Sequence, residues 1–342
     1  MIPAYNGERF LHSAIFSALG QSRKADEIIV VNDASKDGTA GIAHSSEFRG
    51  RIKYYFNEQS SGFVDAWNRA ISKAVGDFVA ILHQDDLLHP EYLEQMETAV
   101  KRYPQVRHLY AACNYIDDND HITGMPPEPY FPEPVLYSGR HYAHNYLSGV
   151  ISNRHIHRCP GVLTSRQLLL KECTYRKEAG HIADDDFFMR VGAYTDVVGI
   201  SQPLASYRHH AGSETGRVDL LSLKLAEAYL FQAEYYSGTE TILESGDILM
   251  INKQAVKFIN LLLFQSLLYK RDEWTKQALD LRNKFEHMLP GFMGQELPRW
   301  SLPMWGLTLS RGRASLSALL YVRMLHSMLR LRDFSKHAVR HK

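Results

Sequence analysis

The sequence of 342 residues contains no run of about 18 apolar residues, so it offers no candidate for a membrane-spanning helix. Cysteine is scarce. Cys113, Cys159 and Cys173 are the only three, and their scatter excludes a metal-ligand pattern or a disulfide framework. A reduced, cytoplasmic interior is therefore the expected location. No internal repeat or low-complexity segment is present, which excludes repeat arrays and fibrous proteins.

Net charge is also nearly absent, because 39 Lys and Arg against 38 Asp and Glu leave +1. The balance is uneven along the chain, however. The segment from Arg311 to Lys342 carries a local net charge of +7, so the preceding residues sum to −6 by difference. A basic tail on a mildly acidic body indicates an anionic surface as a partner. No nucleic acid partner is expected.

The basic tail has an amphipathic pattern that permits two interpretations. From Ala314 to Arg332, leucines and other apolar residues form one broad face, and arginines surround it. This segment is either a helix packed on the rest of the protein or an interfacial helix near anionic lipid. The second interpretation places the protein peripherally on the inner face of the cell membrane.

The order of apolar periods predicts an α/β fold. Strand and helix patterns alternate as βαβαβα over the first 75 residues or so, which is typical of a doubly wound, mostly parallel sheet of the nucleotide-binding kind. Short strands at Val197–Ile200 and Leu204–Arg208 follow later. We expect one domain over residues 1–215, divided into a nucleotide-binding half (1–112) and an acceptor half (113–215), and a helical C-terminal region over residues 216–342.

One stretch, Ala80 to Glu91, organises the rest of the chain. The apolar run Asp77–Leu82 predicts a buried strand of the parallel-sheet type, and it stops at two adjacent carboxylates, Asp85 and Asp86. Ligands of open α/β sheets bind at the carboxyl ends of strands. A carboxylate pair at that place is unfavourable without a cation, so a divalent metal on a diphosphate would explain it. An N-cap followed by a solvated acidic loop is the plainer alternative.

A second acidic cluster begins at Ala183. Three consecutive aspartates, Asp184 to Asp186, precede an apolar helical pattern. Such residues commonly stabilise the first turn of a helix. They also suit a general base, because neighbouring like charges raise the pKa of one member toward useful basicity.

Four segments together resemble glycosyltransferase family 2, in their order and spacing. They are Pro3–Asn6, Val30–Thr39, His83–Asp86 and Ala183–Asp186. The resemblance covers roughly residues 1 to 215. It implies an inverting enzyme with the A-type glycosyltransferase fold, which is Rossmann-like, and a helical C-terminal extension without a family pattern.

The resemblance also implies roles for individual residues. Asp33 would hydrogen-bond the base of the donor, typically uracil, and Asp85 would face the ribose or the metal. Asp86 would bind a divalent metal, Mn²⁺ or Mg²⁺, on the diphosphate. Asp184 would be the general base, with Asp186 as the second choice. The remaining candidates are Ala4, Tyr5, Asn6, Asn68 and Arg208 for the nucleotide sugar, and His210 for the metal.

The sequence departs from the family pattern at three places. Asn32 replaces the usual first acid of its motif, although an amide can still contact base edges. His83 stands where many members have another aspartate, which lowers the negative charge around the metal. Met1 lies almost on the first motif, so we expect the neighbouring strand of the sheet to be left unpaired.

These observations predict a metal-dependent inverting glycosyltransferase. It would move a sugar from a nucleoside-diphosphate donor, of the UDP or dTDP type, to a saccharide or lipid-linked acceptor, in bacterial surface-polysaccharide synthesis. A nucleotidyltransferase is one alternative, but the Gly-rich basic phosphate loop of such enzymes is absent from Pro3 to Arg9. A non-catalytic module that binds a nucleotide sugar is the other.

Overall fold

The computed structural model describes residues 1–125, 131–152, 154–210, 223–238, 241–268 and 271–292. The chain forms two compact units. One comprises residues 1–219 with 238–248, and the other comprises residues 220–237 with 249–342. The basic segment from Ala314 to Lys342 lies outside the described residues.

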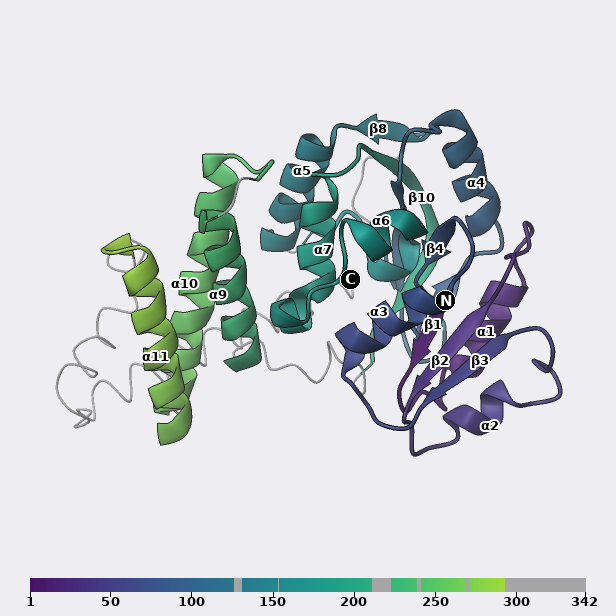
Figure 1. Ribbon diagram of the computed structural model, residues 1–342, viewed down its shortest axis with the longest axis horizontal. Helices are drawn as coiled ribbons and strands as arrows, with labels where there is room; N and C mark the ends of the chain where they lie inside the picture. Colours follow the sequence, from purple (N-terminus) through teal and green to yellow (C-terminus); the bar gives the residue numbers. More distant parts are fainter. Residues whose placement is uncertain (126–130, 153, 211–222, 239–240, 269–270, 293–342) are drawn as a thin grey trace, which may run out of the picture. The chain divides into compact units, whose positions relative to one another are not determined.

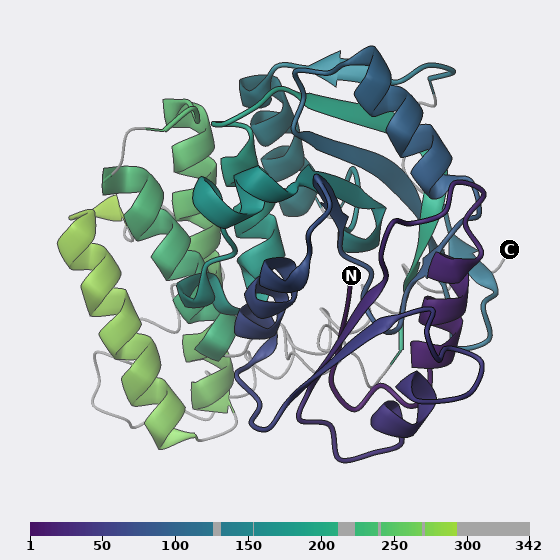
Figure 2. The same cartoon turned by 45° about the vertical axis from the view of Figure 1, so that its right-hand side comes forward.

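The first unit opens with a three-stranded parallel sheet. Its strand order is β1-β2-β3, and in both views α3 lies on one side of it while α1 and α2 lie on the other (Figures 1 and 2). This is the doubly wound arrangement that the alternating pattern predicts. The elements are β1 (Ile2–Ala4), α1 (Leu11–Leu19), β2 (Ile29–Asp33), α2 (Thr39–Ala43), β3 (Lys53–Asn57) and α3 (Phe63–Lys73).

A mixed sheet of seven strands completes the first unit, within the part that the structure describes. Its path is β4-β9-β6-β10-β5, with β7 paired to β6 and β8 paired to β10. The elements are β4 (Phe78–Ala80), β5 (Leu87–Leu88), α4 (Tyr92–Arg102), β6 (His108–Ile116), β7 (Ile122–Gly124), β8 (Val135–Tyr137), α5 (Gly139–Ile151), η1 (Cys159–Gly161), β9 (Val162–Ser165), α6 (Arg166–Lys171), η2 (Lys177–Ile182), α7 (Ala183–Val191) and β10 (Val197–Arg208).

The α/β fold class is confirmed, with corrections in the strand pairing. The apolar run that was predicted as a parallel strand forms β4, which pairs antiparallel with β9. Its other edge meets the start of β1, where the Leu82 N–H donates to the Met1 carbonyl over 3.0 Å. β2 pairs with β1 from Val30 to Asn32, so the expected loss of pairing does not affect this span.

The two short strands predicted near residues 197–208 are one strand, β10. Its register against β6 shifts on both sides of Pro203, because proline cannot donate to the ladder and favours a bulge. The strand therefore continues across the interruption and carries Tyr207 and Arg208 to the same edge as the end of β6.

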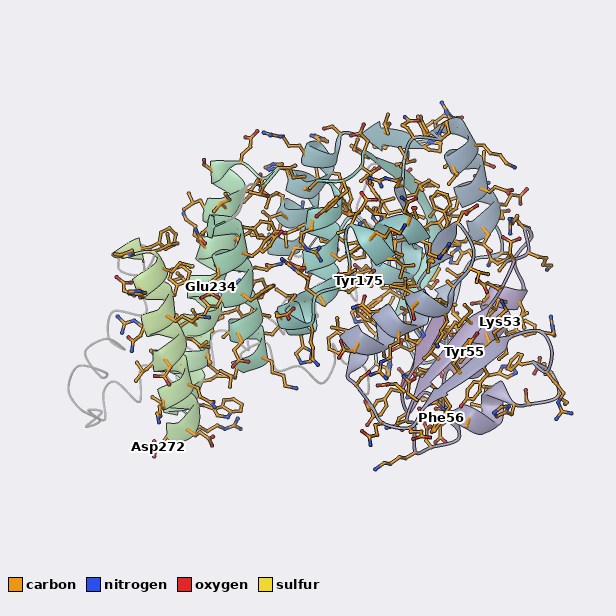
Figure 3. The ribbon with its side chains drawn as sticks, viewed as in Figure 1. Lys53, Tyr55, Phe56, Tyr175, Glu234 and Asp272 are labelled. Carbon is orange, nitrogen blue, oxygen red and sulfur yellow. The ribbon has the colours of Figure 1, made fainter. Side chains whose placement is uncertain are left out.

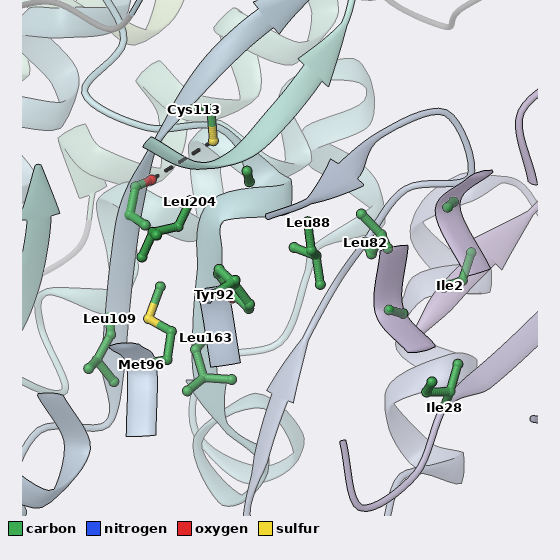
Figure 4. Packing of buried hydrophobic residues seen from close by; sticks show 14 of the residues in the cluster. Ile2, Ile28, Leu82, Leu88, Tyr92, Met96, Leu109, Cys113, Leu163 and Leu204 are labelled. Carbon is green, nitrogen blue, oxygen red and sulfur yellow. Dashed lines mark hydrogen bonds between the residues drawn. The ribbon is translucent and has the colours of Figure 1, made fainter. Parts of the chain in front are cut away.

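The main core of the first unit joins the two sheets. Side chains from both, including Ile2 and Leu109, are buried in one cluster with Leu82 of the loop after β4 and with Tyr92 and Met96 of α4 (Figure 4). Tyr92 also donates its hydroxyl to the Val162 carbonyl over 2.7 Å, so its polar end is satisfied inside the core. This packing fixes the loop between β4 and β5, which carries the candidate site.

The second unit contains helices α9 (Leu223–Gly238), α10 (Ser245–Leu268) and α11 (Asp272–Met288), except for the first turn of α10. The rings of Tyr229 and Phe258 stack with centroids 4.4 Å apart, and Lys284 pairs with Glu234, which is labelled in Figure 3. A helical C-terminal extension is therefore present. No helix among the described residues is long and apolar enough to cross a membrane.

Candidate active site

The loop between β4 and β5 gathers three possible metal ligands. His83, Asp85 and Asp86 each offer an atom within 4.8 Å of the others. Asp86 is buried. One of its oxygens, Oδ1, accepts the backbone N–H of Arg208 over 2.8 Å, whereas Oδ2 has no hydrogen-bond partner among the described residues. The Nε2 atom of His83 also lacks a partner within that part of the chain, and its Nδ1 lies 3.6 Å from Oδ2 of Asp86.

The electrostatics of this loop fit a divalent cation. Burial, and then the charge of Asp85, hold the pKa of Asp86 well above its usual value. Burial lowers the pKa of His83, which favours the neutral imidazole that can bind a metal. A carboxylate oxygen without a partner is costly in such a place, and a cation would remove that cost. Carboxylate and imidazole donors suit Mn²⁺. The residues present therefore fit the predicted metal.

Asp85 and His210 form a pair beside this cluster. The Nε2 atom of His210 lies 2.9 Å from Oδ2 of Asp85. Burial raises the pKa of Asp85, but the hydrogen bond from His210 and the nearby His83 outweigh it and lower the pKa overall. His210 is thus beside the predicted metal ligands, in contact with Asp85. Its role as a ligand itself stays a prediction.

Arg208 lies beside the candidate metal ligands. Its side chain is almost completely buried, and Nε donates to the Asp85 carbonyl over 2.7 Å. Its terminal nitrogens bond the Asp117 carbonyl and the Asp120 carboxylate. Because all three nitrogens have protein partners, the guanidinium holds the Asp85–Asp86 loop against the turn after β6. Its predicted contact with the donor stays a prediction.

Asp33 ends β2 within a polar network. Its Oδ1 accepts from Asn57 Nδ2 over 2.8 Å, and its Oδ2 accepts from the Ser60 hydroxyl over 2.8 Å and the Ser61 N–H over 3.1 Å. Ala34 follows with φ +62°, a strained value for a residue other than glycine. If an N–H group of the donor's nucleobase reaches Asp33, it would therefore replace or join the hydrogen bonds that residues 57–61 donate to this carboxylate.

The loop after β1 is held by reciprocal bonds to two other loops. The Tyr5 N–H donates to Gln84 Oε1 over 2.8 Å, and the Gln84 amide returns a bond to the Tyr5 carbonyl over 3.1 Å. Asn6 exchanges bonds with the loop after β2, through its backbone N–H and its Oδ1. A Cβ at Gly7 would lie 2.2 Å from Gln84 Oε1, so any larger residue would displace the Gln84 amide that bonds Tyr5. Ala4 to Asn6 thus join the ends of β1, β2 and β4.

Helix α3 contributes a ring to the metal side of the site. Trp67 stacks on His83 with ring centroids 5.1 Å apart and 20° between planes. Asn68, the predicted nucleotide contact, instead donates to the Tyr175 carbonyl over 2.8 Å. The sequence indicated only that His83 replaces an aspartate of the family pattern, and it assigned Trp67 no role in the site. Their separation of 16 positions gave no local sign of this stacking.

The three aspartates of α7 have different surroundings. Asp186 is fully buried and binds both Arg176 and Arg190, the latter with 2.9 Å between Nε and Oδ2. This double ion pair argues against Asp186 as a base. Asp184 is half-buried, and its Oδ1 accepts the Asp185 N–H over 3.0 Å. Asp184 also lies close enough to His83 to influence its charge.

Asp185 lies between these two residues and contacts Tyr146, whose hydroxyl donates to Oδ1 over 2.7 Å. Burial, and then repulsion from Asp184, raise the pKa of Asp185 to about 7. The acidic turn thus contains a carboxyl group that titrates near neutrality. The site can bind a cation at one end and accept a proton at the other.

Comparison with known proteins identifies similar sequences and a similar fold. Residues 1–155 match the family model described as "Glycosyl transferase family 2". The uncharacterized glycosyltransferase RT0329 of Rickettsia typhi is 37% identical over 153 residues, which are 44% of this chain and 47% of that protein. The putative glycosyltransferase EpsE of Bacillus subtilis is 32% identical over 146 residues, 42% of this chain and 52% of that protein. The chain thus spans about half the length of these two curated relatives.

Longer matches are more distant. The amylovoran biosynthesis glycosyltransferase AmsB of Erwinia amylovora is 27% identical over 262 residues, 69% of this chain and 80% of that protein. Among solved structures, S. aureus TarS 1-349 in complex with UDP-GlcNAc superposes with a TM-score of 0.63 at 17% identity. This match covers 96% of this chain and 90% of that one. It shows that the two proteins share a fold.

Proposed function

We propose that the chain is a metal-dependent inverting glycosyltransferase of family 2, and the match of residues 1–155 to the model of that family supports this. The donor is a nucleoside-diphosphate sugar, and the acceptor is a saccharide or a lipid-linked saccharide. The observation that carries the proposal is the buried Asp86, whose Oδ2 has no hydrogen-bond partner in the part of the chain that the structure describes, although His83 and Asp85 lie beside it. A buried carboxylate with an oxygen that accepts no hydrogen bond is suited to binding a cation.

The donor side of the reaction uses the ends of β1, β2 and β4. Asp33 and the loop of Ala4, Tyr5 and Asn6 bind the nucleoside, while Asp86, His83 and Asp85 hold Mn²⁺ or Mg²⁺. A bound divalent ion supplies Lewis-acid stabilisation of the leaving diphosphate. His210 keeps Asp85 oriented through the 2.9 Å contact. The likeness in fold to TarS, which was crystallised with UDP-GlcNAc, supports a uridine nucleotide as the first donor to test.

The acceptor side of the reaction uses the acidic turn of α7. Asp184 takes the proton of the acceptor hydroxyl while the oxygen of that hydroxyl forms a bond to the anomeric carbon of the donor sugar. The bond from that carbon to the diphosphate oxygen breaks on the opposite face, and its electron pair leaves with the diphosphate. A positioned base of this kind contributes about 10²- to 10⁴-fold in rate. Asp186 instead stabilises the turn through Arg176 and Arg190.

The biological setting is proposed from the relatives. AmsB is named for amylovoran biosynthesis, which supports a role in bacterial surface-polysaccharide synthesis. The expected cytoplasmic location, peripheral on the membrane, depends on the basic tail and remains a sequence-based proposal.

A panel of nucleotide sugars tests the proposal. Hydrolysis or transfer should release a nucleoside diphosphate from at least one UDP or dTDP sugar with Mn²⁺ present, and EDTA should suppress the release. Asp184→Asn should bind the donor normally and turn it over slowly. If the folded protein binds no nucleoside diphosphate with or without metal, the proposal is wrong. Tight binding without turnover, on every acceptor tried, would indicate a non-catalytic module instead.

A further inference from the structure

Arg158, immediately before η1, is an arginine of the site that the sequence patterns did not single out. Its guanidinium carbon lies 5.7 Å from the ring centre of Tyr115 and 5.2 Å from that of Tyr207. Its Nε donates to the Tyr115 hydroxyl over 3.3 Å. Tyr115 and Tyr207 are register partners on the parallel strands β6 and β10. Two adjacent strands thus hold this guanidinium in one orientation, through cation–π contacts and one hydrogen bond.

The terminal nitrogens of Arg158 distinguish it from other arginines nearby. Within the described part of the chain, neither forms a hydrogen bond or an ion pair with a protein group, although the side chain is half-buried. Arg208 and Arg190, in contrast, use their terminal nitrogens on protein partners. A half-buried guanidinium that is fixed in place but lacks an anion is suited to an anionic ligand.

The position of Arg158 relates it to both ends of the site. Burial chiefly raises the pKa of Asp86 and of Asp185, and the positive charge of Arg158 opposes that rise at each of them. Arg158 is therefore near the candidate metal ligands and near the acidic turn of α7. It forms no ion pair with either carboxylate, so its charge is not neutralised by direct contact in the described structure.

We propose that the terminal nitrogens of Arg158 bind a phosphate oxygen of the donor's diphosphate. The inference rests on the proposed function and adds a residue to it. A guanidinium donates two parallel N–H groups that match phosphate geometry. The diphosphate is the appropriate anion because the metal that it shares is expected at Asp86. Negative charge grows on the diphosphate as the anomeric bond breaks, so this contact strengthens in the transition state.

Binding of UDP and of uridine to Arg158→Gln tests the inference. Calorimetry with Mn²⁺ and with EDTA should show that the substitution lowers the affinity for UDP about 10- to 100-fold. This is the usual effect of losing a hydrogen bond to a charged group. Uridine affinity should not change, because uridine has no phosphate. The loss should persist in EDTA, since Arg158 contacts the phosphate directly. Arg154→Gln, an exposed arginine of the same segment, is the matched control and should bind UDP normally.

The outcomes separate this inference from the proposed function. Equal UDP affinity of Arg158→Gln and wild type overturns the inference alone. Equal weakening of UDP and uridine also overturns it, because it would indicate a structural role. A raised KM for the acceptor with unchanged UDP affinity would assign Arg158 to the acceptor instead. Wild-type protein that binds neither UDP nor dTDP overturns both proposals. Arg158→Lys keeps the positive charge but loses the paired N–H groups. Its affinity for UDP should therefore lie between that of wild type and that of Arg158→Gln.

Discussion

Asp33 and Asp86 are both buried carboxylates near strand ends, but their surroundings are opposite. Asp33 accepts hydrogen bonds on both oxygens from Asn57, Ser60 and Ser61. Asp86 accepts one backbone bond, and its Oδ2 has no partner among the described residues. The proposed nucleoside end of the site is therefore a completed hydrogen-bond network, and the proposed metal end is a set of donor atoms suited to a cation. The same residue type after an apolar strand thus has two different sets of partners.

The largest expected effect is on the metal end. Asp86→Asn keeps an acceptor for the Arg208 N–H but removes the negative charge that a divalent ion requires. Since a metal contributes several kcal/mol to the transition state, turnover should fall about 10³-fold. Metal titration of donor hydrolysis measures this, with the exposed Asp26→Asn as a control. If turnover of Asp86→Asn stays within threefold of wild type at saturating Mn²⁺, Asp86 does not bind the metal, and the contrast with Asp33 is wrong.

The acidic turn of α7 offers a second contrast, between stability and turnover. Asp186→Asn leaves Arg176 and Arg190 without their shared counter-charge, and breaking such a buried pair costs about 3 kcal/mol or more of unfolding free energy. Asp184→Asn should change stability by less than about 0.5 kcal/mol and reduce turnover about 10²- to 10⁴-fold. Urea unfolding and initial rates on both variants measure this. If Asp184→Asn lowers stability and Asp186→Asn lowers turnover, Asp184 is the structural residue and Asp186 is the general base.

A smaller effect is expected at the nucleoside end. Asp33→Asn replaces an acceptor by a donor within the network of Asn57 and Ser60, so uridine and UDP should both bind about tenfold more weakly, a change of about 1.4 kcal/mol. The loss should be the same in Mn²⁺ and in EDTA. For Asp86→Asn, the loss of UDP affinity should appear only with metal. Metal-dependent uridine binding in the Asp33 variant would mean that the two ends are coupled.

The last effect concerns pH and changes stability rather than turnover or binding. The pKa of Asp185 is raised to about 7 by burial and by Asp184, whereas the carboxyl of an unfolded chain titrates near 3.8. Between these values the folded state binds more protons, so this group lowers stability as the pH rises from about 4 to about 7. Asp185 contributes at most about 1.4 kcal/mol per pH unit to the change of unfolding free energy with pH. Urea unfolding at pH 5, 6 and 7 should show a flatter profile for Asp185→Asn. An unchanged profile would contradict the raised pKa.

Much of the fold could be predicted from periodicity and from strand-end residues. The alternation of strand and helix patterns predicted β1 to α3, and the abrupt stop of an apolar run at Asp85 marked the candidate metal loop. The direction of β4 could not be predicted, because a buried strand has the same apolar pattern beside parallel or antiparallel neighbours. The interruption at Pro203 likewise divided one strand into two in the sequence pattern.

The roles of individual side chains were less predictable than the motifs that contain them. Asp186 and Asp184 differ only by their neighbours, and Arg176, which binds Asp186, is ten positions away in an irregular segment. Arg208 was expected at the donor because of the resemblance to the family. Its partners come from the turn after β6, about 90 residues earlier. Contacts at that range depend on tertiary packing, which local patterns do not contain.

The bond that fixes Asp86 comes from the main chain of Arg208 and not from its side chain. Every amino acid except proline supplies the same N–H at position 208. The orientation of the carboxylate should therefore tolerate a wide range of substitutions there, even when the guanidinium contacts are lost. Arg208→Ala and Arg208→Pro should differ sharply in metal affinity. An alanine scan would consequently overlook the contribution of β10 to the site, because the decisive group is one that alanine retains.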